Sequence, residues 1–241
     1  MTYCVGLLVD TGLVMLSDSR TNAGVDQINT FRKMSTFVHP GERALVMMSA
    51  GNLAITQAVI NLLHERPTEN EPSPIFCARN MFDAARVVGE ALREIHRRDA
   101  VSLKEQGHEF NATFILGGQI RGEAPRLFNI YSAGNFIEST SDTNYFQIGE
   151  SKYGKPIIDR VISRSSSLAQ ASKCALVSMD STIRSNLSVG PPLDLAIIRR
   201  DEFRLHTHLS IESDHPYFAM IRTRWGSALR EVFSELPDPK W

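Results

Sequence analysis

The chain begins Met1-Thr2-Tyr3-Cys4-Val5-Gly6 and continues, after a short apolar hairpin, with Asp18-Ser19-Arg20-Thr21-Asn22 and Phe31-Arg32-Lys33. The small side chain of Thr2 is of the kind that allows removal of an initiator methionine. Removal of Met1 would leave an α-amine and a hydroxyl on one residue, which are a general base and a nucleophile held together by covalent bonds. A hydroxyl needs a base within hydrogen-bond reach, and an α-amine titrates close enough to neutrality to act as one. The start of the chain therefore predicts a nucleophile at Thr2.

Two charged residues of the same region suit this chemistry. A nearby ammonium, here that of Lys33, disfavours protonation of an amine, and a carboxylate such as Asp18 orients and pairs the ammonium. Each feature alone has an ordinary explanation, because Asp18 could be a turn residue and Lys33 a solvated strand lysine. Their joint occurrence in this chain order favours a catalytic set of Thr2, Asp18 and Lys33.

These residues, together with Ser49-Ala50-Gly51-Asn52, resemble those of a proteasome β-type peptidase. Two stretches are similar to its bacterial branch called Anbu, the ancestral β subunit: Asp18-Ser19-Arg20-Thr21-Asn22-Ala23-Gly24-Val25-Asp26 and Gly149-Glu150-Ser151-Lys152-Tyr153-Gly154-Lys155-Pro156. The resemblance implies an α+β fold, a four-layer αββα sandwich of the N-terminal nucleophile hydrolase type. It implies one such domain over residues 1–241.

The resemblance also implies further site residues. The N–H of Gly51 would hold the oxyanion, and the backbone of Asn22 would contact the substrate. The family prefers a Gly-Ser-Gly element that supports the amine of the nucleophile; here Gly149-Glu150-Ser151 stands in its place, so Ser151 is a loose substitute. The family also places an aspartate and a serine in the loop before Pro191, and Asp180 and Ser188 are the candidates. Neither a cofactor nor a metal is expected.

The position of Lys33 departs from the family pattern. It follows Thr2 by 31 residues, one fewer than usual. A one-residue shift within a strand would invert the direction of the side chain. We therefore expect the missing residue in the loop 22–30.

Composition excludes several classes of protein. The 241 residues are 42% hydrophobic and 22% charged, as in ordinary globular proteins, and the net charge of -1 gives no electrostatic reason to bind nucleic acid or an anionic membrane. The three cysteines are far apart and odd in number, which favours reduced thiols in a cytoplasmic protein. No basic segment precedes the apolar start, and no apolar run approaches the roughly 20 residues of a membrane span.

Hydrophobic periodicity predicts nine strands and five helices. The strands are 2–9, 13–17, 31–38, 43–50, 109–118, 126–131, 145–149, 193–199 and 203–211, and the helices are 52–65, 77–97, 151–164, 167–184 and 216–235. The Pro- and Glu-rich segment 66–76 reads as a surface loop. Pairs of helices between antiparallel hairpins suit an αββα sandwich.

Two other motifs permit alternative sites. Asp10-Thr11-Gly12 matches an aspartic-protease triplet, but no second copy occurs and its place between two apolar runs favours a hairpin turn. His206 and His208 share one face of a predicted strand and could bind a metal, but no third ligand is evident. Cys4 is the next candidate nucleophile after Thr2.

The sequence therefore predicts a cytoplasmic threonine peptidase that acts on peptides or unfolded proteins. Because an exposed nucleophile would endanger folded proteins, we expect a homo-oligomer, either a closed ring or an open helix, formed through the amphipathic helices 52–65, 77–97 and 151–164. An unidentified unfoldase or activator is a conceivable partner. Three alternatives stay open: a catalytically silent assembly subunit that retains Met1, an amidohydrolase of the same fold that acts on non-peptide amides, and an aspartic protease that would use Asp10 at an acidic pH optimum.

Overall fold

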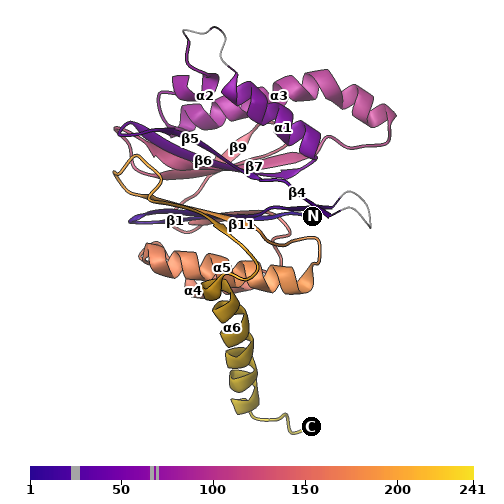
Figure 1. Ribbon diagram of the computed structural model, residues 1–241, viewed down its shortest axis with the longest axis vertical. Helices are drawn as coiled ribbons and strands as arrows, with labels where there is room; N and C mark the ends of the chain where they lie inside the picture. The colour runs from indigo at the N-terminus through magenta and orange to yellow at the C-terminus, as the bar shows by residue number, and fades with distance from the viewer. Residues whose placement is uncertain (23–27, 66–67, 69–70) are drawn as a thin grey trace.

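Two five-stranded sheets lie face to face in the computed structural model, and helices cover the outer face of each (Figure 1). The structure describes residues 1–22, 28–65, 68 and 71–241. The layers run helices, sheet, sheet, helices, so the predicted α+β fold, an αββα sandwich, is confirmed.

The first sheet carries the start of the chain. Its order is β10 (Tyr145–Gly149), β1 (Tyr3–Val9), β2 (Gly12–Asp18), β11 (Leu193–Arg199) and β12 (Thr207–Ile211), and all neighbours are antiparallel. Helices α4 (Lys155–Val161) and α5 (Leu168–Ser185) cover its outer face. Every residue of β1 and β2 is buried, because one face meets these helices and the other meets the second sheet. This explains their nearly continuous apolar sequences.

The second sheet has the order β5 (Met34–His39), β6 (Arg43–Gly51), β7 (Ala112–Ile120), β8 (Arg126–Ile130) and β9 (Phe136–Glu138). Its outer face packs against α1 (Leu53–His64), α2 (Pro74–Cys77) and α3 (Met81–Glu105). A separate small hairpin, β3 (Arg20–Asn22) with β4 (Ile28–Thr30), follows β2 of the first sheet and precedes β5 of the second sheet along the chain. The core consequently has three apolar layers, one between the sheets and one under each helix layer.

A polar clip joins the two sheets at the end opposite Thr2. The side-chain amide of Gln119, which is fully buried in β7, donates to Asp201 Oδ1 at 2.7 Å and accepts from the Asp201 N–H at 2.7 Å. Asp201 and Phe203 both have positive φ, at 64° and 48°, so the chain turns here instead of continuing as a strand. The predicted strand 203–211 is therefore wrong over its first four residues.

Several other boundaries differ from the predictions. Residues 31–33 precede β5 and are not part of a strand. Helix α3 begins at Met81, where the Asn80 side chain accepts the Asp83 N–H, and it extends eight residues past position 97. Helix α4 is much shorter than 151–164. The short elements β3, β4, β9 and α2 were not predicted; α2 lies in the expected loop 66–76, of which residues 66, 67, 69 and 70 lie outside the described part.

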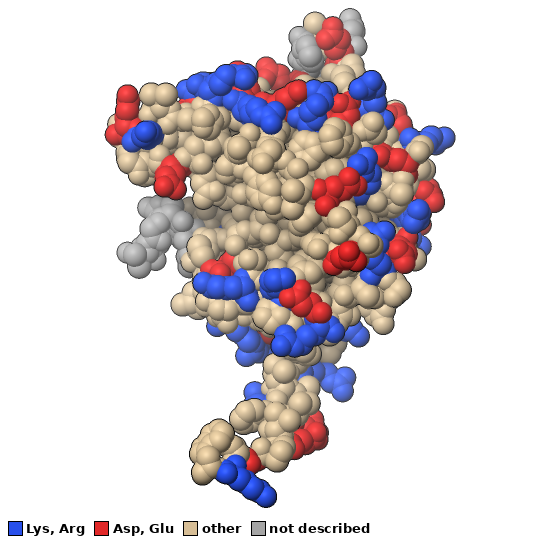
Figure 2. Space-filling view, turned by 180° about the vertical axis from the view of Figure 1, so that it is seen from behind, with Lys and Arg blue, Asp and Glu red and all other residues tan. Residues whose placement is uncertain are grey.

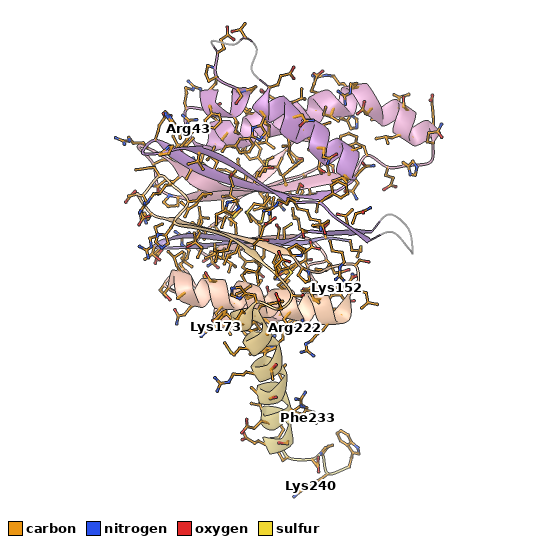
Figure 3. The ribbon with its side chains drawn as sticks, viewed as in Figure 1. Arg43, Lys152, Lys173, Arg222, Phe233 and Lys240 are labelled. Atoms are coloured by element: carbon orange, nitrogen blue, oxygen red, sulfur yellow. The ribbon has the colours of Figure 1, made fainter. Side chains whose placement is uncertain are left out.

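Helix α6 (Pro216–Glu235) projects away from the sandwich (Figure 1). Only Phe218 and Ile221 are buried along it, and Phe233 points into solvent (Figure 3). Its exposed apolar side chains, with that of the residue after it, are Tyr217, Met220, Leu229, Val232, Phe233 and Leu236. The three helices that were expected to mediate assembly pack their apolar faces onto the sheets or onto neighbouring helices, and their role in assembly stays a prediction.

The base of α6 is fixed by ion pairs. The buried Asp180 carboxylate of α5 lies 3.1 Å from Arg184 Nε and 3.3 Å from Arg222 Nε of α6. Arg222 lies where α6 meets α5 in Figure 3. On the face shown in Figure 2, basic and acidic side chains are interspersed, in keeping with the net charge of -1. None of the described helices combines the length and apolar character needed to cross a bilayer.

Candidate active site

The backbone of Thr2 is held at the edge of β1. Its carbonyl accepts the Glu150 N–H at 2.7 Å, and the next N–H along the chain, that of Tyr3, donates to Asp18 Oδ1 at 3.0 Å. Gly149, opposite Tyr3, has a φ of 79°, and a Cβ there would lie 1.9 Å from the Thr2 carbonyl oxygen. Glycine is therefore required for this close approach.

Asp18 and Lys33 form a buried ion pair beside Thr2. Lys33 Nζ donates to Asp18 Oδ1 at 2.8 Å and to the Arg20 carbonyl at 2.6 Å. The second carboxylate oxygen, Oδ2, accepts the Gly190 N–H at 3.3 Å. Burial raises the pKa of the Asp18 carboxyl, while the Lys33 ammonium and the N–H groups of Tyr3 and Gly190 act in the opposite direction. Since three donors converge on this one carboxylate, the ammonium has a fixed position.

A cavity of about 580 Å³ opens at this point. Its lining residues are Met1, Thr2, Thr21, Lys33, Ser49, Ala50, Gly51, Asn52, Leu53, Thr56, Asn111 and Gly149. It brings the chain start, the end of β10 and the start of α1 together. The candidate nucleophile Thr2, the cation Lys33 and the strand-to-helix glycine Gly51 therefore face one space.

The N–H of Gly51 points into the region that Lys33 lines. The Ser49 N–H donates to the Lys33 carbonyl at 3.0 Å, and residues two apart in a strand direct their N–H groups to the same side. Strand β5 does not continue opposite Gly51, since it pairs with β6 only as far as Met48. Gly51 has a φ of 118°, and a Cβ there would lie 2.3 Å from the Asn111 carbonyl oxygen. An N–H donor at this point, which no described residue of β5 faces, is suited to hold an oxyanion.

The structure brings Thr2, Asp18, Lys33 and Gly51 together, despite the short spacing between Thr2 and Lys33. The missing residue was expected in the loop 22–30, of which residues 23–27 lie outside the described part. Asn22 ends β3 opposite Ile28, and its neighbour Thr21 lines the cavity.

The three supporting candidates do not line this cavity. The Ser151 N–H donates to the Gly149 carbonyl and the Ser188 N–H to Asn186 Oδ1, while Asp180 pairs with the arginines at the base of α6. The polar groups behind Thr2 are instead Glu150 and the loop that ends at Gly190. The sequence analysis did not predict that Gly190 would bind Asp18. For Glu150, the available signal was an acidic residue at the position where the family prefers the serine of Gly-Ser-Gly.

The alternative sites do not lie in this cavity. Asp10 is exposed at the hairpin turn and lies 3.3 Å from Arg164 Nε. Cys4 is fully buried, and burial raises the pKa of its thiol, so it is a poor nucleophile. His206 precedes β12, and its Nδ1 lies 3.5 Å from Glu202 Oε2. Among the described residues, no group of three His, Cys, Asp or Glu side chains is arranged to hold a metal ion.

Solved structures decide the family. Anbu, the ancestral β-subunit, from Yersinia bercovieri is 54% identical, with a TM-score of 0.92 and 99% of each chain covered. This chain belongs to the Anbu family. The Anbu complex of Pseudomonas aeruginosa, described as a helical assembly, is 48% identical with a TM-score of 0.93, over 99% of this chain and 98% of that one.

Other comparisons relate this Anbu chain to the proteasome. A curated relative, proteasome subunit beta 2 of Nitrosopumilus maritimus (strain SCM1), is 25% identical over 213 residues, which span 86% of this chain and 90% of the relative. No family model matches the chain. The Anbu fold is thus of the proteasome β type.

Proposed function

We propose that this Anbu protein is a threonine peptidase whose nucleophile is Thr2 after removal of Met1. The observation that carries the proposal is the buried Asp18–Lys33 pair, which shares Asp18 Oδ1 with the Tyr3 N–H directly after Thr2. A fixed ammonium next to the chain start favours the neutral, basic form of a freed α-amine. A role in stability alone would not explain why the ion pair lies at the same cavity as Thr2.

The reaction follows from this geometry. Thr2 Oγ attacks the peptide carbonyl carbon and its proton passes to the Thr2 amine, while the Gly51 N–H stabilises the oxyanion. The amine then gives the proton to the leaving nitrogen, and the C–N bond breaks to leave an ester on Thr2. Water then attacks the carbonyl carbon of this ester while the amine accepts a proton from the water. The bond between the acyl carbon and Thr2 Oγ breaks, the amine returns the proton to Oγ, and the product leaves as a carboxylic acid. The Asn22 backbone would help to hold the extended substrate.

We further propose self-association of this chain in the cytoplasm, in a ring or an open helix. The Pseudomonas aeruginosa relative is described as a helical assembly, and α6 exposes an apolar surface. The three cysteines are free thiols, in keeping with a reducing compartment. Peptides or unfolded proteins would be the substrates, and an unfoldase or activator would be a separate partner.

A silent assembly subunit is the second candidate. Because Met1 lines the cavity beside Thr2, a chain that retained Met1 would have an amide where the base is needed. An amidohydrolase that acts on non-peptide amides would use the same residues.

Turnover of fluorogenic peptides and of small non-peptide amides separates these possibilities. Wild-type protein should cleave the peptides, and Thr2→Ala should lose that activity with its thermal unfolding unchanged. Cleavage of the small amides alone would indicate an amidohydrolase, and no turnover by processed protein would favour the silent subunit.

A further inference from the structure

A buried glutamate, Glu150, binds the backbone of Thr2. The Glu150 N–H donates to the Thr2 carbonyl at 2.7 Å, and its Oε2 accepts the Asn186 side-chain amide at 3.0 Å. Glu150 is only 6% exposed. A glutamate is rarely buried to this degree unless a partner binds its charge. The second carboxylate oxygen lies 3.5 Å from Lys152 Nζ, whose side chain is 69% exposed, at the same end of the molecule as the N-terminus (Figures 1 and 3).

Asn186 uses both ends of its side-chain amide. Its Nδ2 donates to Glu150, and its Oδ1 accepts the Ser188 N–H at 3.0 Å. Its backbone ends α5, since its N–H donates to the Thr182 carbonyl at 2.8 Å. Asn186 is thus the junction between α5, the end of β10 and the following loop.

That loop leads to the catalytic carboxylate. The Val189 N–H donates to the Asn186 carbonyl at 3.1 Å, and the next N–H, that of Gly190, donates to Asp18 Oδ2 at 3.3 Å. The hydrogen bonds therefore form a continuous chain that starts and ends beside Thr2. It runs from the Thr2 carbonyl through Glu150, Asn186 and the loop to Asp18, which accepts the Tyr3 N–H. The contacts join three separate parts of the sequence: the first 18 residues, Glu150, and the loop 186–190.

We propose that Glu150 and Asn186 form a positioning pair that fixes Thr2 relative to Asp18. The proposal rests on the proposed function, because it assigns the pair to the same candidate active site. The carboxylate–amide bond holds the end of β10 against the 186–190 loop. Through the Glu150 N–H, the pair fixes the position of the Thr2 carbonyl. Through the Gly190 N–H, it fixes the position of the Asp18 carboxylate. Neither residue lines the cavity, so neither touches the substrate directly.

Four variants test the pair through its hydrogen-bond pattern. Glu150→Gln keeps an acceptor for Asn186 and should label with an epoxyketone within about threefold of the wild-type rate. Asn186→Asp places two carboxylates face to face, and Glu150→Ala removes the acceptor; each should slow labelling by about tenfold or more. The double variant Glu150→Gln with Asn186→Asp reverses the pair and should recover to within about threefold. Asn61→Asp, on the exposed face of α1, adds the same charge as a control.

Hydrogen exchange of the peptide that contains Gly190 gives a readout independent of activity. Exchange should accelerate in Asn186→Asp, return to the wild-type rate in the double variant and stay unchanged in Asn61→Asp. If the wild type never labels but exchange follows this pattern, the proposed function fails and the pair stands. Two outcomes would refute the pair and leave the function standing, provided that the wild type labels. In one, Asn186→Asp matches the wild type in both labelling rate and exchange rate; in the other, the double variant labels and exchanges as Asn186→Asp does.

Discussion

Lys33 Nζ donates to Asp18 Oδ1 at 2.8 Å, and this oxygen also accepts the N–H that directly follows Thr2. One carboxylate oxygen therefore fixes both the cation and the backbone of the candidate nucleophile. The Asp18 carboxylate is fully buried, so the position of the Lys33 ammonium and that of the Tyr3 N–H both depend on it. Removing either charge leaves the other without compensation in the interior.

Substitutions of the ion pair should be strongly non-additive. Lys33→Met leaves a buried carboxylate unpaired and should cost about 3–5 kcal/mol of unfolding free energy. Adding Asp18→Asn to that variant should restore much of this stability, because no buried charge is left. Both variants should lose covalent labelling. Urea unfolding and labelling of the two singles and the double measure this, and simple addition of the two stability losses would contradict a shared network.

Gly149→Ala should displace the chain start. The new Cβ would lie 1.9 Å from the Thr2 carbonyl oxygen, so labelling should fall by more than tenfold and stability should drop. Gly107→Ala is the matched control, because Gly107 has a similar φ of 74° but no neighbour within 4 Å of a Cβ. The free energy of unfolding of Gly107→Ala should fall by about 1–2 kcal/mol, because alanine is strained at a positive φ, and its labelling rate should not change. Equal labelling by both variants would refute a positional role for Gly149.

Gln119→Leu should affect stability alone. Gln119 is fully buried and makes two hydrogen bonds to Asp201 and one to the Glu123 carbonyl. Its loss leaves several polar groups unpaired and should cost about 2–3 kcal/mol. Because the clip lies at the opposite end from Thr2, labelling by the folded variant should match the wild type. A selective loss of labelling would show that the sheet-to-sheet clip also positions the site.

Assembly should depend on the projecting helix. Val232→Glu combined with Phe233→Glu places charges on side chains that are 57% and 77% exposed on α6. Light scattering at micromolar concentration should show a smaller particle, while the fold is retained because neither residue contacts the core. Ser234→Glu on the same helix is the control and should assemble normally. An unchanged particle size in the double variant would exclude this part of α6 from the interface.

The sequence could predict elements whose pattern is local. The sequences of β1 and β2 are almost entirely apolar because both faces of these strands are buried, and Asp18 and Lys33 lie close to Thr2 in the chain. The turn after β11 was predicted at Asp201-Glu202, but its full length was not, because Asp201, which has a positive φ, is held by Gln119, 82 residues away. Gly190 binds Asp18 across 172 residues, and Glu150 meets Asn186 across 36, so no local signal identifies these contacts.

The most direct measurement is intact mass spectrometry of the protein made in its native host cells, before and after incubation with an epoxyketone. The mass before incubation should correspond to the chain without Met1. Incubation should add one inhibitor, bound through both the amine and the hydroxyl of Thr2, and Thr2→Ala should remain unmodified. A chain that retains Met1, or a processed chain whose adduct forms equally in Thr2→Ala, would contradict Thr2 as the nucleophile.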